Sequence, residues 1–196
     1  MNPYNPSIFP EADFQRKLPG IQGEIVQVEK DCIDWTDKEF QIRQDLSGPL
    51  SAEPLESLAR SIRQLGLIRL PVLRLSSLGA AGSETFGKKC TVVAGFRRIQ
   101  AITRILGQEK LWCRVLPASV EPWECAFLAV ADNALTSSLL PGEIIRAVGL
   151  LAQFYPHEQI ANASESLFGS SFHLSRIQEL LAVARMEDPW PALLDA

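Results

Sequence analysis

Two adjacent arginines beside a glycine are the residues of this chain best suited to binding an anion. Gly95, Arg97 and Arg98 follow the short apolar run from Cys90 to Ala94. The β-branched residues of that run predict a buried strand, and Gly95 predicts a turn at its end. Guanidinium groups bind phosphate oxygens in pairs, and a glycine lets a ligand approach the backbone closely. The three residues therefore predict a phosphate site.

A helix is predicted directly after this turn. Its apolar residues recur every three or four positions, and Gly107 is expected to end it. The start of a helix presents unpaired N–H groups and a positive dipole end, which also favour an anion. The alternative is that Arg97 and Arg98 are solvated charges at an ordinary strand-to-helix turn, because G-x-R-R is a short pattern.

Several further motifs occur in a fixed order around the two arginines. They are Phe40-Gln41-Ile42-Arg43, Leu58-Ala59-Arg60-Ser61-Ile62, Gly66-Leu67-Ile68, and Val92 to Arg98 followed by Ala101. In this order the chain resembles the ParB/sulfiredoxin-like superfamily, and within it a divergent ParB-type partition protein. The resemblance runs from about Glu24 to Glu143, with a weaker continuation to about Met186.

The resemblance and the apolar pattern together imply an α+β fold in three parts. Residues 1–23 are expected to form an irregular arm, because they contain four prolines among polar residues. Residues 24–117 are expected to form a small mixed-sheet, ParB-like nucleotide-binding domain. Residues 118–196 are expected to form an all-helical domain with a helix-turn-helix-like unit.

The expected elements can be given by range. Strands are expected over 24–28, 67–75, 90–94 and 110–116, and helices from about residue 54 to 65, 96 to 106, 120 to 132 and 141 to 155. In the helix over 120–132 the residues expected to be buried are Trp123, Phe127, Leu128 and Ala131, and in the helix over 141–155 Arg146 is expected to be exposed.

Residues 157–186 show the pattern of two helices around a tight turn. The first is expected to end near Phe168, the turn to pass through Gly169, and the second to begin near Leu174. Such a unit reads DNA with the start of its second helix. The alternative is a helix pair that only packs. The candidate DNA-binding residues are Ser171, His173, Ser175, Arg176 and Gln178, while Ile177, Leu180, Leu181 and Val183 are expected to face inward.

The resemblance also implies a cofactor and further site residues. It implies CTP and magnesium binding, which closes a clamp on DNA, and Arg43 would add a third positive group near the phosphates. Asp132 and Asn133 stand where the family has E-N-x-x-R and would lie near magnesium or the phosphates; their oxygens suit magnesium. Phe96 replaces the glutamate of the family's G-E-R-R, and Thr136 replaces the arginine of E-N-x-x-R.

Composition limits the remaining functions. The net charge of −4 means that the cations needed for DNA binding must gather on one face, or that a partner must add avidity. The four cysteines are widely spaced without a C-x-x-C pair, so no structural metal site is expected. Without a long apolar run or a signal-peptide pattern, the expected location is the cytoplasm, with no membrane partner.

Three functions stay open at this point. The first is a nucleotide-binding and DNA-binding protein that acts in DNA partition or transcriptional regulation. Such a protein would be at most a weak nucleoside triphosphatase, and no catalytic residue is assigned to it. If it forms a clamp on DNA, it would need to be a homodimer. The second is a nucleotide-dependent small-molecule kinase on the same fold, which needs a base such as Glu39 or Asp45 near the arginines. The third is a non-catalytic adaptor that has lost nucleotide turnover, which Phe96 favours. A sulfiredoxin is excluded because Phe96 stands where its cysteine belongs, and a nuclease is disfavoured because no acidic set is clustered.

Overall fold

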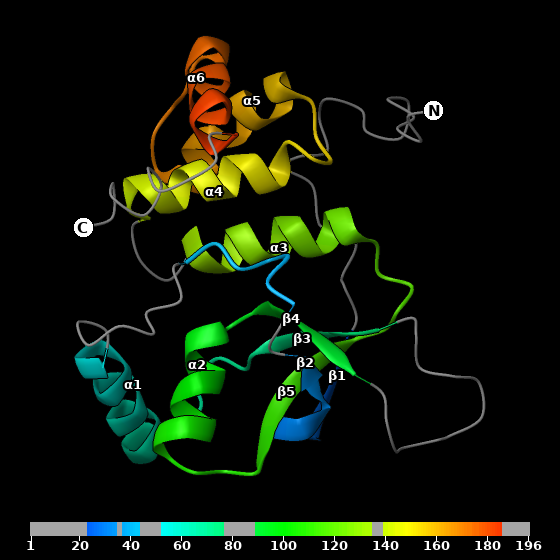
Figure 1. Cartoon of the computed structure of the whole chain (residues 1–196), viewed down its shortest axis with the longest axis vertical. Helices are drawn as coiled ribbons and strands as arrows, with labels where there is room; N and C mark the ends of the chain where they lie inside the picture. The colour runs from blue at the N-terminus through cyan, green and yellow to red at the C-terminus, as the bar shows by residue number, and fades with distance from the viewer. Residues whose placement is uncertain (1–22, 35–36, 44–51, 77–88, 135–138, 186–196) are drawn as a thin grey trace. The chain divides into compact units, whose positions relative to one another are not determined.

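The chain folds as two compact units. The computed structural model describes residues 23–34, 37–43, 52–76, 89–134 and 139–185, and these group into one unit within residues 23–129 and one within residues 130–185. The first contains a sheet and the second is helical, so the expected α+β fold is confirmed (Figure 1). Helix α3 (Pro122–Ala134) contributes residues to both units, and the domain boundary expected near Pro117 stays a prediction.

The sheet of the first unit is mixed and has five strands in the order β1-β5-β3-β4-β2. Pairing is antiparallel between β1 and β5 and between β3 and β4, and parallel between β3 and β5 and between β2 and β4. The bounds are β1 (Glu24–Glu29), β2 (Ile33–Asp34), β3 (Val72–Leu75), β4 (Cys90–Ala94) and β5 (Lys110–Leu116), with the short 3-10 turn η2 (Lys30–Cys32) between β1 and β2.

Helices pack beside the sheet and bury its alternate side chains. Helix α1 (Ala52–Leu65) packs against α2 (Phe96–Gln100) and against the π-helical turn η4 (Ala101–Ile105) that continues α2. Figure 1 shows α1 beside α2. Alternate residues of β3, β4 and β5 point into one core with residues of the arginine helix, because strand side chains alternate between faces. That core includes Leu73, Val92, Cys113, Ile99 and Ile102.

The strand expected from Leu67 begins only at Val72, so that prediction is wrong in its first part. Gly66 has a φ of 78° and its N–H bonds to the carbonyl of Ile62, which ends α1 and turns the chain. The carbonyl of Pro71 accepts from the N–H of Arg114 at 2.9 Å, although proline itself donates nothing to a ladder. Residues 66–71 therefore form a loop that joins the sheet only at its end.

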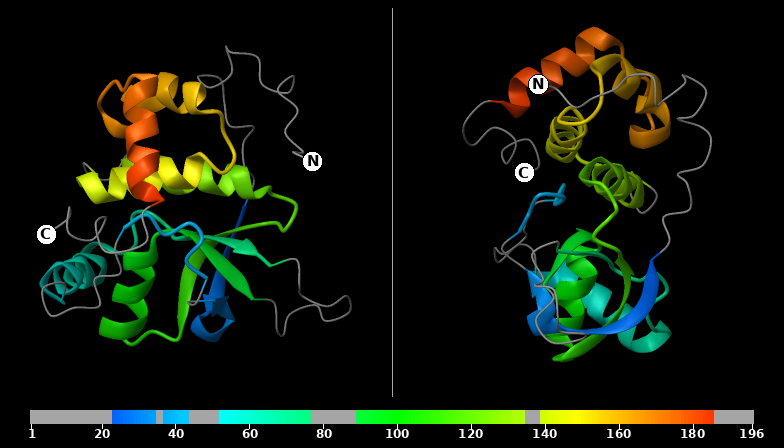
Figure 2. Two further views of the ribbon diagram at one scale, coloured as in Figure 1. Left: turned by 45° about the horizontal axis from the view of Figure 1, so that its top comes forward. Right: turned by 90° about the vertical axis from the view of Figure 1, so that its right-hand side faces the viewer.

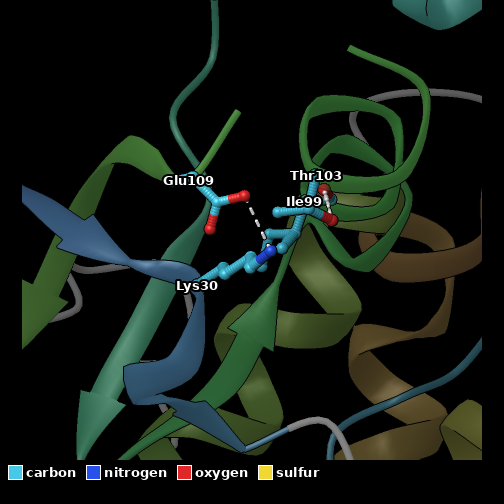
Figure 3. Close-up of polar contacts among 4 residues, drawn as sticks. All are labelled: Lys30, Ile99, Thr103 and Glu109. Atoms are coloured by element: carbon cyan, nitrogen blue, oxygen red, sulfur yellow. Dashed lines mark hydrogen bonds and ion pairs between the residues drawn. The ribbon is translucent and has the colours of Figure 1, made fainter. Parts of the chain in front are cut away.

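The helix after Gly95 has the expected extent but an unexpected pitch. The N–H of Leu106 bonds to the carbonyl of Ala101 at 3.0 Å, five residues back, as in a π-helix. The hydroxyl of Thr103 donates to the carbonyl of Ile99 at 2.9 Å (Figure 3), which is a competing bond for a backbone acceptor in the same segment. Gly107 follows with a φ of 65° and ends the helix as predicted.

A lysine and a glutamate join η2 to the chain just before β5. The ammonium of Lys30 lies 2.8 Å from a carboxylate oxygen of Glu109 (Figure 3), and the N–H of Lys30 bonds to the carbonyl of Glu109 at 2.9 Å. The side chain of Glu109 is 71% exposed and that of Lys30 37%, so solvent screens the ion pair and the backbone bond is the more dependable part of this link.

The second unit contains three helices that pack against one another: α4 (Pro141–Leu151), α5 (His157–Phe168) and α6 (Leu174–Ala184) (Figure 2). The buried carboxylate of Glu143 accepts from the N–H of Leu140 at 3.0 Å and so caps the start of α4. Helix α4 ends at Leu151, four residues before the expected end, and Arg146 is half-buried rather than exposed.

The buried side of α3 differs from the expected one. Trp123, Phe127, Leu128 and Ala131 are only half-buried. The fully buried residues are instead small or of medium size: Cys125, Ala126, Ala129 and Val130. Small side chains permit a close approach to a neighbouring surface, and a helix with apolar residues on most positions has no unique inward stripe in its sequence.

Three of the four cysteines are predicted to be unreactive in the folded protein. All four are free thiols, with Cys32 half-buried and the others buried. Burial raises the pKa of Cys90 to about 11 and the pKa of both Cys113 and Cys125 to about 12, which keeps the nucleophilic thiolate scarce. At pH near 8 a disulfide reagent should modify Cys32 alone, and all four in denaturant. Fast modification of several thiols in the native protein would contradict the burial of these strands and of α3.

The described helices include none that is both long and apolar enough to cross a membrane. The described residues likewise contain no group of three histidine, cysteine or acidic side chains placed to hold a metal ion.

Candidate functional site

Gly95 makes the turn that the sequence predicts between β4 and α2. It has a φ of 90° and a ψ of 25°, in the left-handed region that favours glycine. A Cβ on this residue would lie 3.0 Å from the Cα and 3.3 Å from the Cβ of Pro71. The close approach that Gly95 permits is therefore to the backbone of Pro71, and it fixes where the arginines of α2 begin.

Arg98 supports the loop before β3. Its Nη1 donates to the carbonyl of Leu70 at 3.1 Å and to the carbonyl of Arg69 at 3.3 Å. An ordered loop needs partners for its backbone carbonyls, and a charged donor is a strong one. Arg98 thus has a structural role that the sequence did not indicate. Its charge still lies in the first turn of α2, with its Cζ 3.4 Å from the Cβ position of Gly95.

Arg97 shares this turn with Arg98. It is half-buried, and the first turn of α2 contains no acidic residue. Two guanidinium groups without an acidic neighbour in the same turn give a positive potential at the start of the helix. Gly95, Arg97 and Arg98 are brought together as the sequence predicted, while their binding of phosphate stays a prediction.

Arg43 belongs to the same unit but to a different segment. In residues 37–43, Phe40 and Ile42 are buried, and Gln41 and Arg43 at the alternate positions are half-buried. Phe40 and Ile42 are each 1% exposed, so the segment is packed against the protein at these two positions. The role of Arg43 as a third phosphate ligand stays a prediction.

Phe96 packs inward. It is partly buried against the core cluster of the sheet. At this position the ParB-type sequence has a glutamate, which could accept a proton or hold a water, and a phenylalanine ring can do neither. The side chain contributes to the packing of the turn.

A polar group on the other face of the sheet was missed by the sequence analysis. Arg74 of β3 lies opposite Thr91 of β4 in the sheet. The Nη2 of Arg74 donates to the carbonyl of Ala118 at 3.1 Å. The hydroxyl of Thr91 donates to the carboxylate of Asp37 at 3.0 Å. An arginine inside an apolar strand pattern was the available signal, because such a residue needs internal acceptors.

Glu39, the candidate base of a kinase, has a raised pKa. Burial is the main cause, the charge of Asp37 adds to it, and Arg74 opposes it. These charged neighbours belong to the Arg74 group and not to the turn at Gly95, so they give the kinase reading no support. Asp45, the other candidate base, lies outside the described residues.

The predicted helix-turn-helix is present with the expected bounds. Helix α5 ends at Phe168, Gly169 has a φ of 69°, and α6 begins at Leu174. The rings of Phe168 and Phe172 stack with their centroids 5.7 Å apart. All five candidate DNA-binding residues are exposed, namely Ser171, His173, Ser175, Arg176 and Gln178, while Ile177, Leu180 and Leu181 are buried and Val183 is half-buried.

A buried serine holds the turn between the two helices. The hydroxyl of Ser164 donates to the carbonyl of Ala161 and accepts from the N–H of Phe172, both at 2.7 Å. Ser164 is fully buried and Phe172 is half-buried, so this hydroxyl supplies a partner within the protein to the N–H of Phe172. It therefore sets the direction in which the chain enters α6.

The charge of the segment that contains α5 and α6 is less favourable for DNA binding than the exposure of its polar side chains. Arg176 pairs with Glu179 one turn later, with Nη1 and Oε2 2.9 Å apart on the surface. Over residues 157–185 three glutamates face two arginines. Contact with DNA phosphates through α5 and α6 would therefore release few counterions.

Asp132 and Asn133 lie in the last turn of α3 and are half-buried. They belong to the second unit, whereas Gly95 and the arginines belong to the first. Their role toward magnesium or phosphate stays a prediction. Thr136, the departure from the family motif, lies outside the described residues.

Comparison with known proteins finds similarity of fold among solved structures. No family model matches the chain, and no curated protein matches it. Among solved structures, the chain is similar to the C-terminally truncated chromosome-partitioning protein ParB from Caulobacter crescentus, in a crystal structure of its complex with CTP-gamma-S. The similarity covers 88% of this chain and 84% of that chain, at 18% sequence identity and a TM-score of 0.44. An identity of 18% describes a similarity of fold alone.

Proposed function

We propose that this protein binds DNA through its helix-turn-helix and binds a nucleotide at the turn before α2, in the manner of a ParB-type protein of DNA partition or transcriptional regulation. The observation that carries the DNA-binding part is the start of α6. Five polar residues there are exposed together, from Ser171 to Gln178, and Ile177 between them is buried. A helix with this distribution can offer hydrogen-bond groups to base edges while its other side stays packed.

Selection of DNA sequences from a random duplex library tests this proposal. The full chain should enrich one sequence motif, because bidentate contacts discriminate between bases by about 1–3 kcal/mol each. A Ser175→Ala, Gln178→Ala double variant should lose that enrichment. Ser166→Ala, an exposed serine on α5, is the matched control and should enrich the same motif. Equal enrichment by the double variant, or no enrichment by the native chain, would overturn the DNA-binding part.

The nucleotide part rests on Arg97 and Arg98 in the first turn of α2, with no acidic residue in that turn. At this turn the two guanidinium groups would hold the phosphates of the nucleotide. Because Phe96 offers no proton acceptor and packs against the core, we expect binding with little turnover. This is the property that a regulatory or adaptor protein needs.

The Arg97→Gln variant tests the nucleotide part by calorimetry with CTP and with ATP, each with magnesium. The native chain should bind CTP, and loss of one charge-assisted contact should weaken binding by about one to two decades. Arg97 is the better choice because replacing Arg98 would also release the loop at Arg69 and Leu70. Arg104→Gln, on the same helix, should not change affinity. Transfer of phosphate from ATP to a small acceptor would favour a kinase, and binding of neither nucleotide would favour an adaptor.

A further inference from the structure

The positive charge of this chain is concentrated in one stretch of sequence. Residues 57–108 contain nine of the 19 lysines and arginines but only one acidic residue, Glu84. This stretch therefore carries a charge of +8 and the rest of the chain −12, which together give the net −4. A charge separation of this size within one protein indicates a polyanionic partner.

Four exposed arginines of this stretch lie on or beside one pair of packed helices. Arg60 and Arg63 are one turn apart on α1, Arg69 is in the loop after α1, and Arg104 is on η4, which packs against α1. We call these four residues the arginine face. Within the described part of the chain none of them forms an ion pair. Their charges are thus available to a ligand, unlike that of Arg176, which Glu179 neutralises.

The loop that carries Arg69 is held in place. Its start is closed by the bond from Gly66 to Ile62, and its end by the bonds from Arg98 to the carbonyls of Arg69 and Leu70. A fixed backbone reduces the entropy that binding would cost. Arg69 therefore projects from a preorganised support.

We propose that the arginine face binds the phosphate backbone of DNA and supplies the sequence-independent part of the affinity, while α6 reads the bases. This inference rests on the proposed DNA-binding function. The arginine face is a different site from the proposed nucleotide site at the turn before α2, since neither Arg97 nor Arg98 belongs to it. Arginine forks suit phosphate oxygens. The division of labour follows from the charges, because the helix-turn-helix itself has more glutamates than arginines.

A protein partner is the competing occupant. Leu65 and Ile68 are 68% and 80% exposed between the arginines of α1 and Arg69, and exposed aliphatic groups gain nothing from a phosphate backbone. The strict absence of carboxylates from residues 57–76 favours the polyanion, and the experiment separates the two occupants.

The test measures binding of the full chain to a short duplex of arbitrary sequence, by fluorescence anisotropy at salt concentrations from about 50 to 200 mM. The Arg60→Gln, Arg63→Gln variant should lower the slope of log K against log salt by about 2 and weaken binding roughly tenfold for each arginine near 0.1 M salt. Arg114→Gln, at another exposed arginine, on β5, should leave the slope unchanged. The Arg60→Lys, Arg63→Lys variant should retain most of the native slope, because the two positive charges remain. Because both residues are exposed, the variants should melt at the native temperature.

The other outcomes of these binding measurements distinguish failure of the arginine face from failure of the proposed function. No binding of any duplex by the native chain, together with no selected motif, would overturn the proposed function itself. Native binding with an unchanged slope in Arg60→Gln, Arg63→Gln, but a loss in Ser175→Ala, Gln178→Ala, would keep that function and overturn the arginine face. If the slope is unchanged and Leu65→Ser, Ile68→Ser instead alters the sedimentation of the protein, the surface binds a protein and the inference is wrong.

Discussion

Replacing Gly95 by alanine is expected to lower the free energy of unfolding by about 2–4 kcal/mol. The left-handed conformation at this residue contributes about 1–2 kcal/mol of that cost for any residue with a Cβ. The remainder comes from the new methyl group, which would lie 3.0 Å from the Cα of Pro71. Pro71 cannot move away easily, because its carbonyl is bonded to the N–H of Arg114 in β5.

Gly107→Ala is the matched control for this experiment. Gly107 also has a positive φ, of 65°, but no atom lies within 4 Å of the position that its Cβ would take. It should therefore show only the conformational cost, about 1–2 kcal/mol. Equilibrium unfolding in urea measures both variants, with equal m-values as the condition for comparison. Equal losses would show that the contact between Gly95 and Pro71 is not as close as described.

Replacing Ser164 by alanine is expected to destabilise the helical unit by about 1–3 kcal/mol. The substitution deletes the hydroxyl that accepts from the N–H of Phe172 and leaves that part-buried N–H without this partner. Because this bond joins α5 to the residue before α6, the chain between the two helices should loosen, and the motif selected from the DNA library should become less sharp.

Ser166→Ala provides the comparison for Ser164→Ala. Ser166 lies two residues later on α5 and is exposed, so its hydroxyl is solvated and its replacement should change stability by less than about 0.5 kcal/mol. Circular dichroism during urea unfolding measures both. If the two serines behaved alike, the hydroxyl of Ser164 would not be the element that fixes the turn.

Helix ends and turns that are marked by a glycine between two apolar patterns could be predicted from the sequence. The turn of the helix-turn-helix is an example, since Gly169 ends one apolar period and Leu174 starts the next, and both bounds are confirmed. The turn at Gly95 is another, because a glycine between a β-branched run and a helical stripe has few other readings.

The parts that depend on distant partners could not be predicted. The sequence gives no sign that Arg98 bonds to the carbonyls of Arg69 and Leu70, 29 and 28 residues earlier, because that contact exists only once β3 and β4 have paired. The late start of β3 at Val72 has the same cause. In α3 the apolar residues surround the helix, so the inward side was decided by packing of Cys125 and its small neighbours and not by periodicity.

The strand order places β1 and β2 at the two margins of the sheet, and this has a consequence for the behaviour of the protein at high concentration. An open margin is a template for cross-molecular strand addition, the first step toward insoluble fibres. Here β2 is only two residues long, and β1 carries a glutamate at each end, Glu24 and Glu29. A second β1 running antiparallel beside the first would bring the glutamate end of each strand close to the opposite glutamate end of the other, and such like charges at an edge disfavour strand addition.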